Sequence, residues 1–145
     1  MIAKDPVQEL LKGYRDILSV VEYDGEQVPC TVTFLHDKTV YLMLSIPDFE
    51  NAGTDDSVIY NLTLRVEVVT EYLAKEERET VANKIMEQVT PLIADETNVN
   101  SELSNFNIDL VFPQTGDREI DQDNISSLVI KRKDFTLYVE QLPEN

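Results

Sequence analysis

The stretch NLTLRVEVVTEYLAKEERETVANKIMEQV, residues 61–89, changes its hydrophobic period part-way along. Every second position from Tyr60 to Val68 is apolar, and polar residues lie between them. Further on, apolar residues recur at helical spacing, at Val81, Ala82, Ile85, Met86, Val89 and Leu92. A two-residue period is typical of a half-buried strand, and steps of three and four residues are typical of an amphipathic helix. The pattern therefore predicts a long strand followed almost directly by a long helix.

The same reading extends to the flanking segments. Asp5-Pro6 is a favourable helix start, and an apolar stripe predicts a helix over about residues 6 to 21. Asp24-Gly25 predicts a turn. The segments 28–35 and 39–46 have strand character and are joined by His36-Asp37-Lys38, which indicates a hairpin. The central helix is expected to be capped by Thr70 and to break or kink at Thr90-Pro91.

The second half of the chain alternates polar connections with strand patterns. Residues 47–57, 95–105 and 114–124 are polar and are expected to be loops. FNIDLVFP, residues 106–113, places Phe106, Ile108, Leu110 and Phe112 on one face of a strand. The last segment holds a long strand or a strand pair, and its apolar positions change from even to odd across KRKD, which predicts a bulge or turn there. The element order α-β-β-β-α-β-β indicates one α+β domain over residues 1–145, with helices on one face of a mainly antiparallel sheet.

Composition narrows the function more than it narrows the fold. The formal net charge is −16, and the acidic residues are spread along the chain instead of forming a tail. Such a surface repels phosphate and anionic lipid, which disfavours sequence-specific DNA binding. No stretch has the length and apolarity of a membrane span, and the N-terminus lacks the pattern of a secretory signal, so we expect a protein made in the cytoplasm.

A search for catalytic or metal-binding residues finds no convincing set. His36 is the only histidine and Cys30 the only cysteine, so neither a His-rich zinc site nor an intramolecular disulfide can form. DREIDQD, residues 117–123, has alternating acids but lacks the glycine and closing glutamate of a calcium-binding EF-hand loop. The basic cluster Lys131-Arg132-Lys133 is too short for a nucleic-acid patch and is better suited to pairing with acidic neighbours. We therefore expect neither enzymatic activity nor a cofactor or metal.

The order of elements resembles the tail-completion or tail-terminator family of long-tailed bacteriophages. The resemblance rests on a short N-terminal helix, an apolar strand, the acidic loop PDFENAGTDDS, a long strand ending RVEVVT, the helix EERETVANKIMEQV and two further strands. It implies a structural virion protein that forms a ring, expected to be a hexamer, at the head–tail junction. That ring would terminate the tail tube and join it to the head connector or neck proteins, while DNA passes through its acidic lumen.

The resemblance also places the expected contacts between subunits and neighbouring rings. They would lie on the two acidic loops, on the strand edges and on the polar face of the central strand. The candidate interface residues are Asp48, Glu50, Asp55, Asp56, Arg65, Glu67, Lys131, Arg132 and Lys133.

Two other classes of function stay open at this point. An acidic inhibitor that mimics DNA would explain the charge and the absence of a catalytic set, although such mimics concentrate their charge on one face. A small hydrolase would rest on His36 alone, and a lone loop histidine is more often a solvated side chain. Arg65 and Glu67 could equally be an ordinary surface ion pair without a partner protein.

Overall fold

The computed structural model describes residues 2–35, 39–54, 56–71, 75–114, 118–122 and 128–144. Its helices are α1 (Val7–Ile17), the single 3-10 turn η1 (Leu18–Val20), α2 (Lys75–Ala94) and α3 (Glu96–Asn100). Its strands are β1 (Glu22–Tyr23), β2 (Glu26–Gln27), β3 (Cys30–Thr31), β4 (Val40–Asn51), β5 (Ile59–Thr70), β6 (Phe106–Pro113), β7 (Arg118–Gln122) and β8 (Leu128–Gln141). The predicted α+β class is confirmed.

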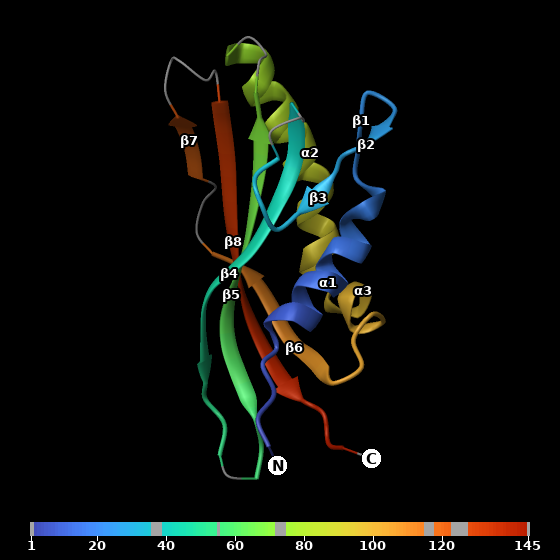
Figure 1. Ribbon diagram of the computed structural model, residues 1–145, viewed down its shortest axis with the longest axis vertical. Helices are drawn as coiled ribbons and strands as arrows, with labels where there is room; N and C mark the ends of the chain where they lie inside the picture. Colours follow the sequence, from blue (N-terminus) through green and yellow to red (C-terminus); the bar gives the residue numbers. More distant parts are fainter. Residues whose placement is uncertain are drawn as a thin grey trace.

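A twisted sheet forms the body of the molecule. Its strand order is β3-β4-β5-β8-β6, and β7 also pairs with β8. The pairs β4–β5, β5–β8, β6–β8 and β7–β8 are antiparallel, and β5 and β8 stay in register without a break from Ile59↔Glu140 to Thr70↔Val129. The β6 and β7 strands follow one another along the same edge of β8, while α1, α2 and α3 lie on one side of the sheet (Figure 1). Helices on one face of a mainly antiparallel sheet are therefore also confirmed.

The main core lies between the helices and this sheet face. The even-numbered residues Leu62, Leu64, Val66 and Val68 of β5 are buried there. From α2 the predicted stripe supplies Val81, Ala82, Ile85, Met86 and Val89. Its burial explains why this helix forms, because packing of an apolar face supplies most of the stability of a helix in a protein.

Local signals set the boundaries near the N-terminus as predicted. The Asp5 carboxylate accepts a hydrogen bond from the Val7 amide at 2.8 Å at the start of α1. Asp24 and Gly25 have φ angles of 54° and 79° and connect β1 to β2. Two successive residues in the left-handed region form the tight hairpin turn for which an Asp-Gly pair is favoured.

The predicted hairpin between residues 28–35 and 39–46 is wrong. Strand β3 spans only Cys30–Thr31 and pairs with β4 in parallel, with Cys30 opposite Leu42. The rest of the apolar run forms no strand, and Val32 and Phe34 are 44% and 53% exposed. Alternation predicted the strand, but it carries no information on whether a neighbouring strand is available. His36 lies outside the described residues.

The predicted loop over residues 47–57 is shorter in the structure. Strand β4 continues to Asn51, with Asp48 opposite Thr63 and Glu50 opposite Asn61. A register shift between Ser45 and Asp48 accommodates Pro47, which has no amide hydrogen for a regular ladder.

Four further predictions differ from the structure. Helix α2 runs through Pro91 to Ala94, because the proline lies near its end and burial of Ile93 holds the last turn. Thr70 ends β5 and donates to the Val129 carbonyl instead of capping a helix. Residues 95–105 contain α3, which the Asp95 side chain caps, and residues 114–124 contain β7.

The expected bulge at KRKD in β8 is absent. Even-numbered Ile130 is buried because β8 is covered on both faces at this end, where Tyr41, Met43 and Val69 form a second small cluster with it. The parity change in the sequence thus marks a change in which face is apolar, not an extra residue. The real irregularity is in β6, between Ile108 and Leu110.

Candidate functional site

The sheet face that the helices do not cover carries most of the candidate residues. We call it the open face. Odd-numbered residues of β5 and even-numbered residues of β8 point to it, because their neighbours in sequence are buried in the main core. Arg65 and Glu67 from β5 and Arg132 from β8 lie together there. The sequence predicted this placement of Arg65 and Glu67 correctly.

Two cross-strand ion pairs organise the centre of the open face. Arg65 donates to both carboxylate oxygens of Asp134, at 3.0 Å from Nε and 3.1 Å from a terminal nitrogen. Arg132 donates to Glu67 Oε2 at 3.1 Å. In each pair the partners are directly opposite in the β5–β8 register. The hydrogen bonds to Asp134 favour the charged guanidinium and raise the pKa of Arg65.

An apolar patch lies on the same face, beside these pairs. Leu110 and Phe112 of β6 are 56% and 42% exposed. Phe112 packs on Tyr138 of β8, with 5.6 Å between ring centroids. The bulge after Ile108 explains the patch, since Phe106 and Ile108 are buried in the main core while Leu110 and Phe112 lie opposite Tyr138 and Thr136. The predicted single apolar face of this strand is therefore wrong.

Sequence reasoning missed this patch because the alternation across Phe106, Ile108, Leu110 and Phe112 is unbroken. The one available signal was Val111, which makes both parities of the strand apolar near its end. In the structure Val111 is partly buried and packs against the main core.

A carboxylate pair borders the apolar patch. Asp109 accepts from the Asn107 side chain at 2.9 Å and lies beside Glu140. Partial burial, followed by the nearby Asp109, raises the pKa of Glu140 above its ordinary value. Neither carboxylate has an ion-pair partner in the part of the chain that the structure describes. We call Asp109, Leu110, Phe112, Tyr138 and Glu140 the β6 patch.

The remaining candidates are dispersed. Lys131 and Lys133 point to the helix side of the sheet, where they donate to Asn83 and Thr90 of α2. The KRK cluster is thus split between the two faces. Asp48 and Glu50 of β4 lie opposite Thr63 and Asn61 and therefore also point to the open face. Asp56 lies in the turn beyond β4, and Asp55 is outside the described residues.

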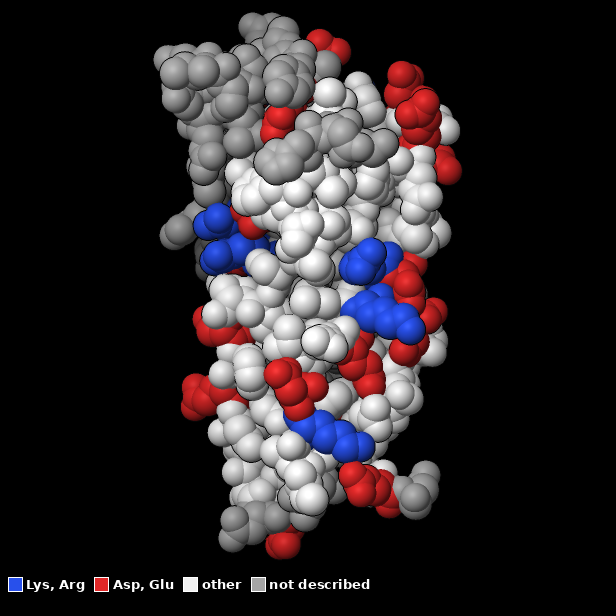
Figure 2. Space-filling view, viewed as in Figure 1, with Lys and Arg blue, Asp and Glu red and all other residues white. Residues whose placement is uncertain are grey.

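A second surface feature lies along α1. It is a groove of about 640 Å³ whose walls include Lys4, Leu11, Lys12, Arg15, Val32 and Phe106. We call it the α1 groove. Figure 2 shows basic side chains over α1, with acidic side chains directly beside them. Within the described ranges Lys12 and Arg15 have no ion pair.

Among the described residues we find no candidate metal site and no activated nucleophile. Among them no group of three or more His, Cys, Asp or Glu side chains could hold a metal ion. Burial raises the pKa of the Cys30 thiol to about 12, so it is protonated at neutral pH and a poor nucleophile. No helix in the described segments has the length and apolarity to cross a membrane.

The comparisons with known proteins point to one fold. A chain in the solved virion of a native gene transfer agent (GTA) particle has a similar fold, with a TM-score of 0.62 over 92% of this chain and 95% of that chain. The two sequences are 9% identical, so the likeness shows a shared fold and no more. No protein-family model and no curated protein matches the chain. A fold that occurs in a virion particle agrees with the resemblance found in the sequence.

Proposed function

We propose that this chain is a structural protein of a phage-like virion, which forms a ring at the head–tail junction. There it terminates the tail tube and joins it to the head connector. The observation that carries the proposal is the likeness of fold to a chain of the GTA virion over 92% of the length. The order of elements supplies the finer assignment to a tail terminator, through its resemblance to that family.

The surface of the molecule supports an assembly role. The exposed Leu110 and Phe112 form an apolar area beside the polar side chains at the centre of the open face, and exposed apolar areas rimmed by polar groups are typical of protein interfaces. The net charge of −16 suits a ring through which DNA passes without adhering. The DNA-mimic alternative gains no support from the open face, because Arg65 and Arg132 neutralise carboxylates at its centre.

Removal of the gene from an otherwise intact phage-like particle tests this proposal. We expect filled heads and separate tails to accumulate, and the wild-type gene supplied in trans to restore joined particles. Electron microscopy of purified particles, with the chain carrying a bound antibody label, should then place it at the junction. Finding the chain absent from particles, or placed at the distal tail end, would contradict the proposal. Recovery of the chain with nucleases instead of tail or head proteins would favour the inhibitor.

A further inference from the structure

The α1 groove combines apolar walls with two cations, Lys12 and Arg15, that make no ion pair within the described residues. Asp5 and Glu9 also line the groove, but their carboxylates accept hydrogen bonds from Val7, Ser104 and Asn105. Leu11, Val32 and Phe106 contribute the apolar part, and Val32 is 44% exposed. Lys12 and Arg15 contribute the charge. Two cations with no ion-pair partner among the described residues, in a chain that carries −16 overall, favour an acidic occupant.

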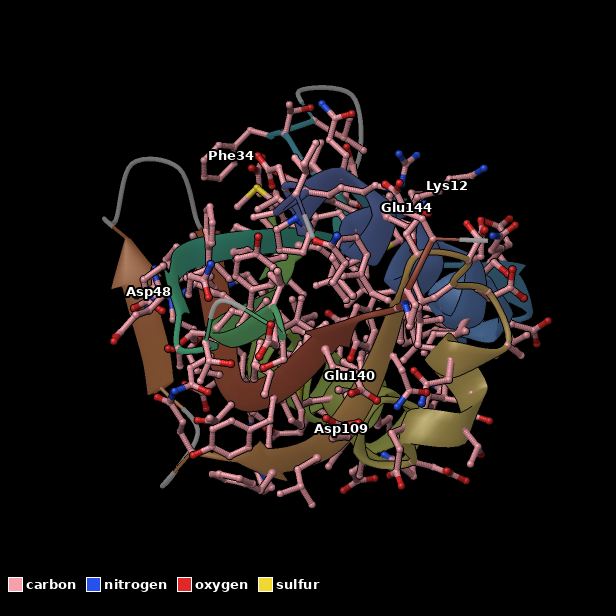
Figure 3. All side chains as sticks on the ribbon, turned by 90° about the horizontal axis from the view of Figure 1, so that it is seen from below. Lys12, Phe34, Asp48, Asp109, Glu140 and Glu144 are labelled. Carbon is pink, nitrogen blue, oxygen red and sulfur yellow. The ribbon has the colours of Figure 1, made fainter. Side chains whose placement is uncertain are left out.

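The β6 patch has the complementary composition. Leu110 and Phe112 are its exposed apolar part, and Asp109 and Glu140 are its acidic border. All these side chains lie on the open face, whereas the α1 groove is built on the helix side of the sheet. Figure 3 shows Lys12 near the upper edge of the view and Asp109 and Glu140 in its lower half.

We propose that the α1 groove of one copy receives the β6 patch of a second copy. This inference rests on the proposed ring and identifies the contact that builds it. Leu110 and Phe112 would pack against Leu11 and Val32, while Lys12 and Arg15 would pair with the carboxylates of Asp109 and Glu140. Because the two surfaces differ and lie on different sides of the molecule, the contact is head-to-tail, and its repetition gives a ring when the rotation between neighbouring copies closes.

The contact uses side chains because the neighbouring strand edge is blocked. The outer edge of β6 at Ile108 is occupied by Asn100 of α3, which accepts from the Ile108 amide at 2.8 Å and donates to its carbonyl at 3.0 Å. Pro113, further along the same edge, has no amide hydrogen to donate. Extension of the sheet from β6 into a second copy is therefore disfavoured. The exposed face of β6 remains available for contact.

Charge reversal of each surface tests the contact. The groove variant is Lys12→Glu with Arg15→Glu, and the patch variant is Asp109→Lys with Glu140→Lys. We expect the wild-type chain to sediment as a ring, and each variant alone to associate at least about tenfold more weakly, since about 1.4 kcal/mol of lost pairing is a factor of ten. Circular dichroism should show both variants folded.

A mixture of the groove variant and the patch variant gives the decisive test of the contact. An equal mixture of the two variants places acid opposite base at every contact, so we expect rings to return at the wild-type concentration. A matched control, Glu77→Lys with Glu87→Lys, changes the charge by the same amount as the patch variant at exposed positions on α2 outside both surfaces. We expect this control to assemble as the wild type does.

Three results would overturn the inference. They are a wild-type chain that stays monomeric, variants that assemble as the wild type does, and a mixture that fails to recover. Normal rings from both charge-reversed variants would reject this contact but leave the proposed function intact. The location of the chain in particles tests the proposed function separately, so the two failures are distinguishable.

Discussion

Two buried tyrosines of this fold differ in whether their hydroxyl groups have a hydrogen-bond partner. Tyr14 of α1 is fully buried, and its hydroxyl has no hydrogen-bond partner among the described residues. Burial accordingly raises the pKa of Tyr14. Tyr60 is also buried, but its hydroxyl donates to the Lys4 carbonyl at 2.7 Å.

Tyrosine-to-phenylalanine substitutions at these positions should therefore have opposite effects. We expect Tyr14→Phe to leave the free energy of unfolding unchanged or to raise it by about 1 kcal/mol, because an unsatisfied buried hydroxyl is removed. Tyr60→Phe should lower it by about 1 kcal/mol, because a satisfied hydrogen bond is lost. Urea denaturation of both variants measures this difference. A clear loss of stability in Tyr14→Phe would mean that its hydroxyl is bonded in solution.

The Arg65–Asp134 pair should stabilise the monomer whether or not the open face meets a partner. The two side chains are only 27% and 20% exposed, so removing one leaves a partly desolvated charge. We expect Arg65→Ala to lower the free energy of unfolding by about 1–2 kcal/mol, between the values for exposed and buried pairs. The exchange Arg65→Asp with Asp134→Arg should recover part of this loss, measured by urea denaturation. An exchange no more stable than the single variant would show that packing, not pairing, sets the effect.

Periodicity placed Arg65 and Glu67 but did not predict the ion pairs that they form. The alternation in β5 correctly put Arg65 and Glu67 on the polar face. It could not show that each would pair with β8 instead of with the other, because strand register depends on contacts distant in sequence. It also grouped Lys131 with Arg132, although successive residues of a strand point to opposite faces.

At the scale of helices and strands, the predictions failed at β-bulges: β6 has one that was not predicted, and β8 lacks the one that was. The ends of β6 and the apolar stripe of α2 could be read from the sequence, because each depends on local periodicity. The bulge after Ile108 left that alternation intact and yet moved Leu110 and Phe112 to the open face. In β8 the reverse holds, since a change of parity occurs without any bulge. Periodicity reports which positions are apolar, whereas the neighbouring elements decide which face is buried.

The contact between α3 and β6 gives a test at this scale. Asn100 provides both an acceptor and a donor to the backbone of Ile108, as a neighbouring strand would. We expect Asn100→Ala to lower the free energy of unfolding by about 1–3 kcal/mol, because two partly buried backbone groups lose their partners. Amide hydrogen exchange should show faster exchange at Ile108. Asn107→Ala is the matched control, since its side chain bonds only to Asp109 on the surface, and it should leave that amide protected.

At the scale of the whole molecule, the sheet separates two unlike surfaces. The strands of the sheet place the α1 groove on one side and the β6 patch on the other (Figure 3). The fold class could be predicted because it follows from the order of local patterns. The β6 patch could not, because it is made of residues from β6 and β8 that only the folded sheet brings together.

Salt should act on the stability of the fold and on the proposed ion pairs between copies in opposite directions. Screening weakens the mutual repulsion of the acidic residues, so the melting temperature of the monomer should rise with salt. A gain of about 1 kcal/mol would raise it by roughly 3–5 °C in a chain of this length. The proposed pairing of Lys12 and Arg15 with Asp109 and Glu140 should weaken under the same screening. The measurement is calorimetry and sedimentation between about 0.01 M and 1 M NaCl, where the Debye length falls from about 30 Å to 3 Å.

Mild acid should also change the melting temperature of the monomer and the stability of the rings in opposite directions. The direction of the change in the monomer follows from the pKa of Glu140. Its pKa is raised in the folded chain, so the folded state binds this proton more tightly than the unfolded state. Its ionised form therefore costs stability above that pKa, and the cost disappears as the pH falls through it. Through Glu140 alone, we expect the melting temperature of the monomer to rise in mild acid, while the rings weaken because the Glu140 carboxylate is lost as a partner for Lys12 and Arg15. Glu140→Gln should reproduce both changes at neutral pH. A variant that melts at the wild-type temperature and keeps its rings would show that this carboxylate is neither strained in the monomer nor used in the contact.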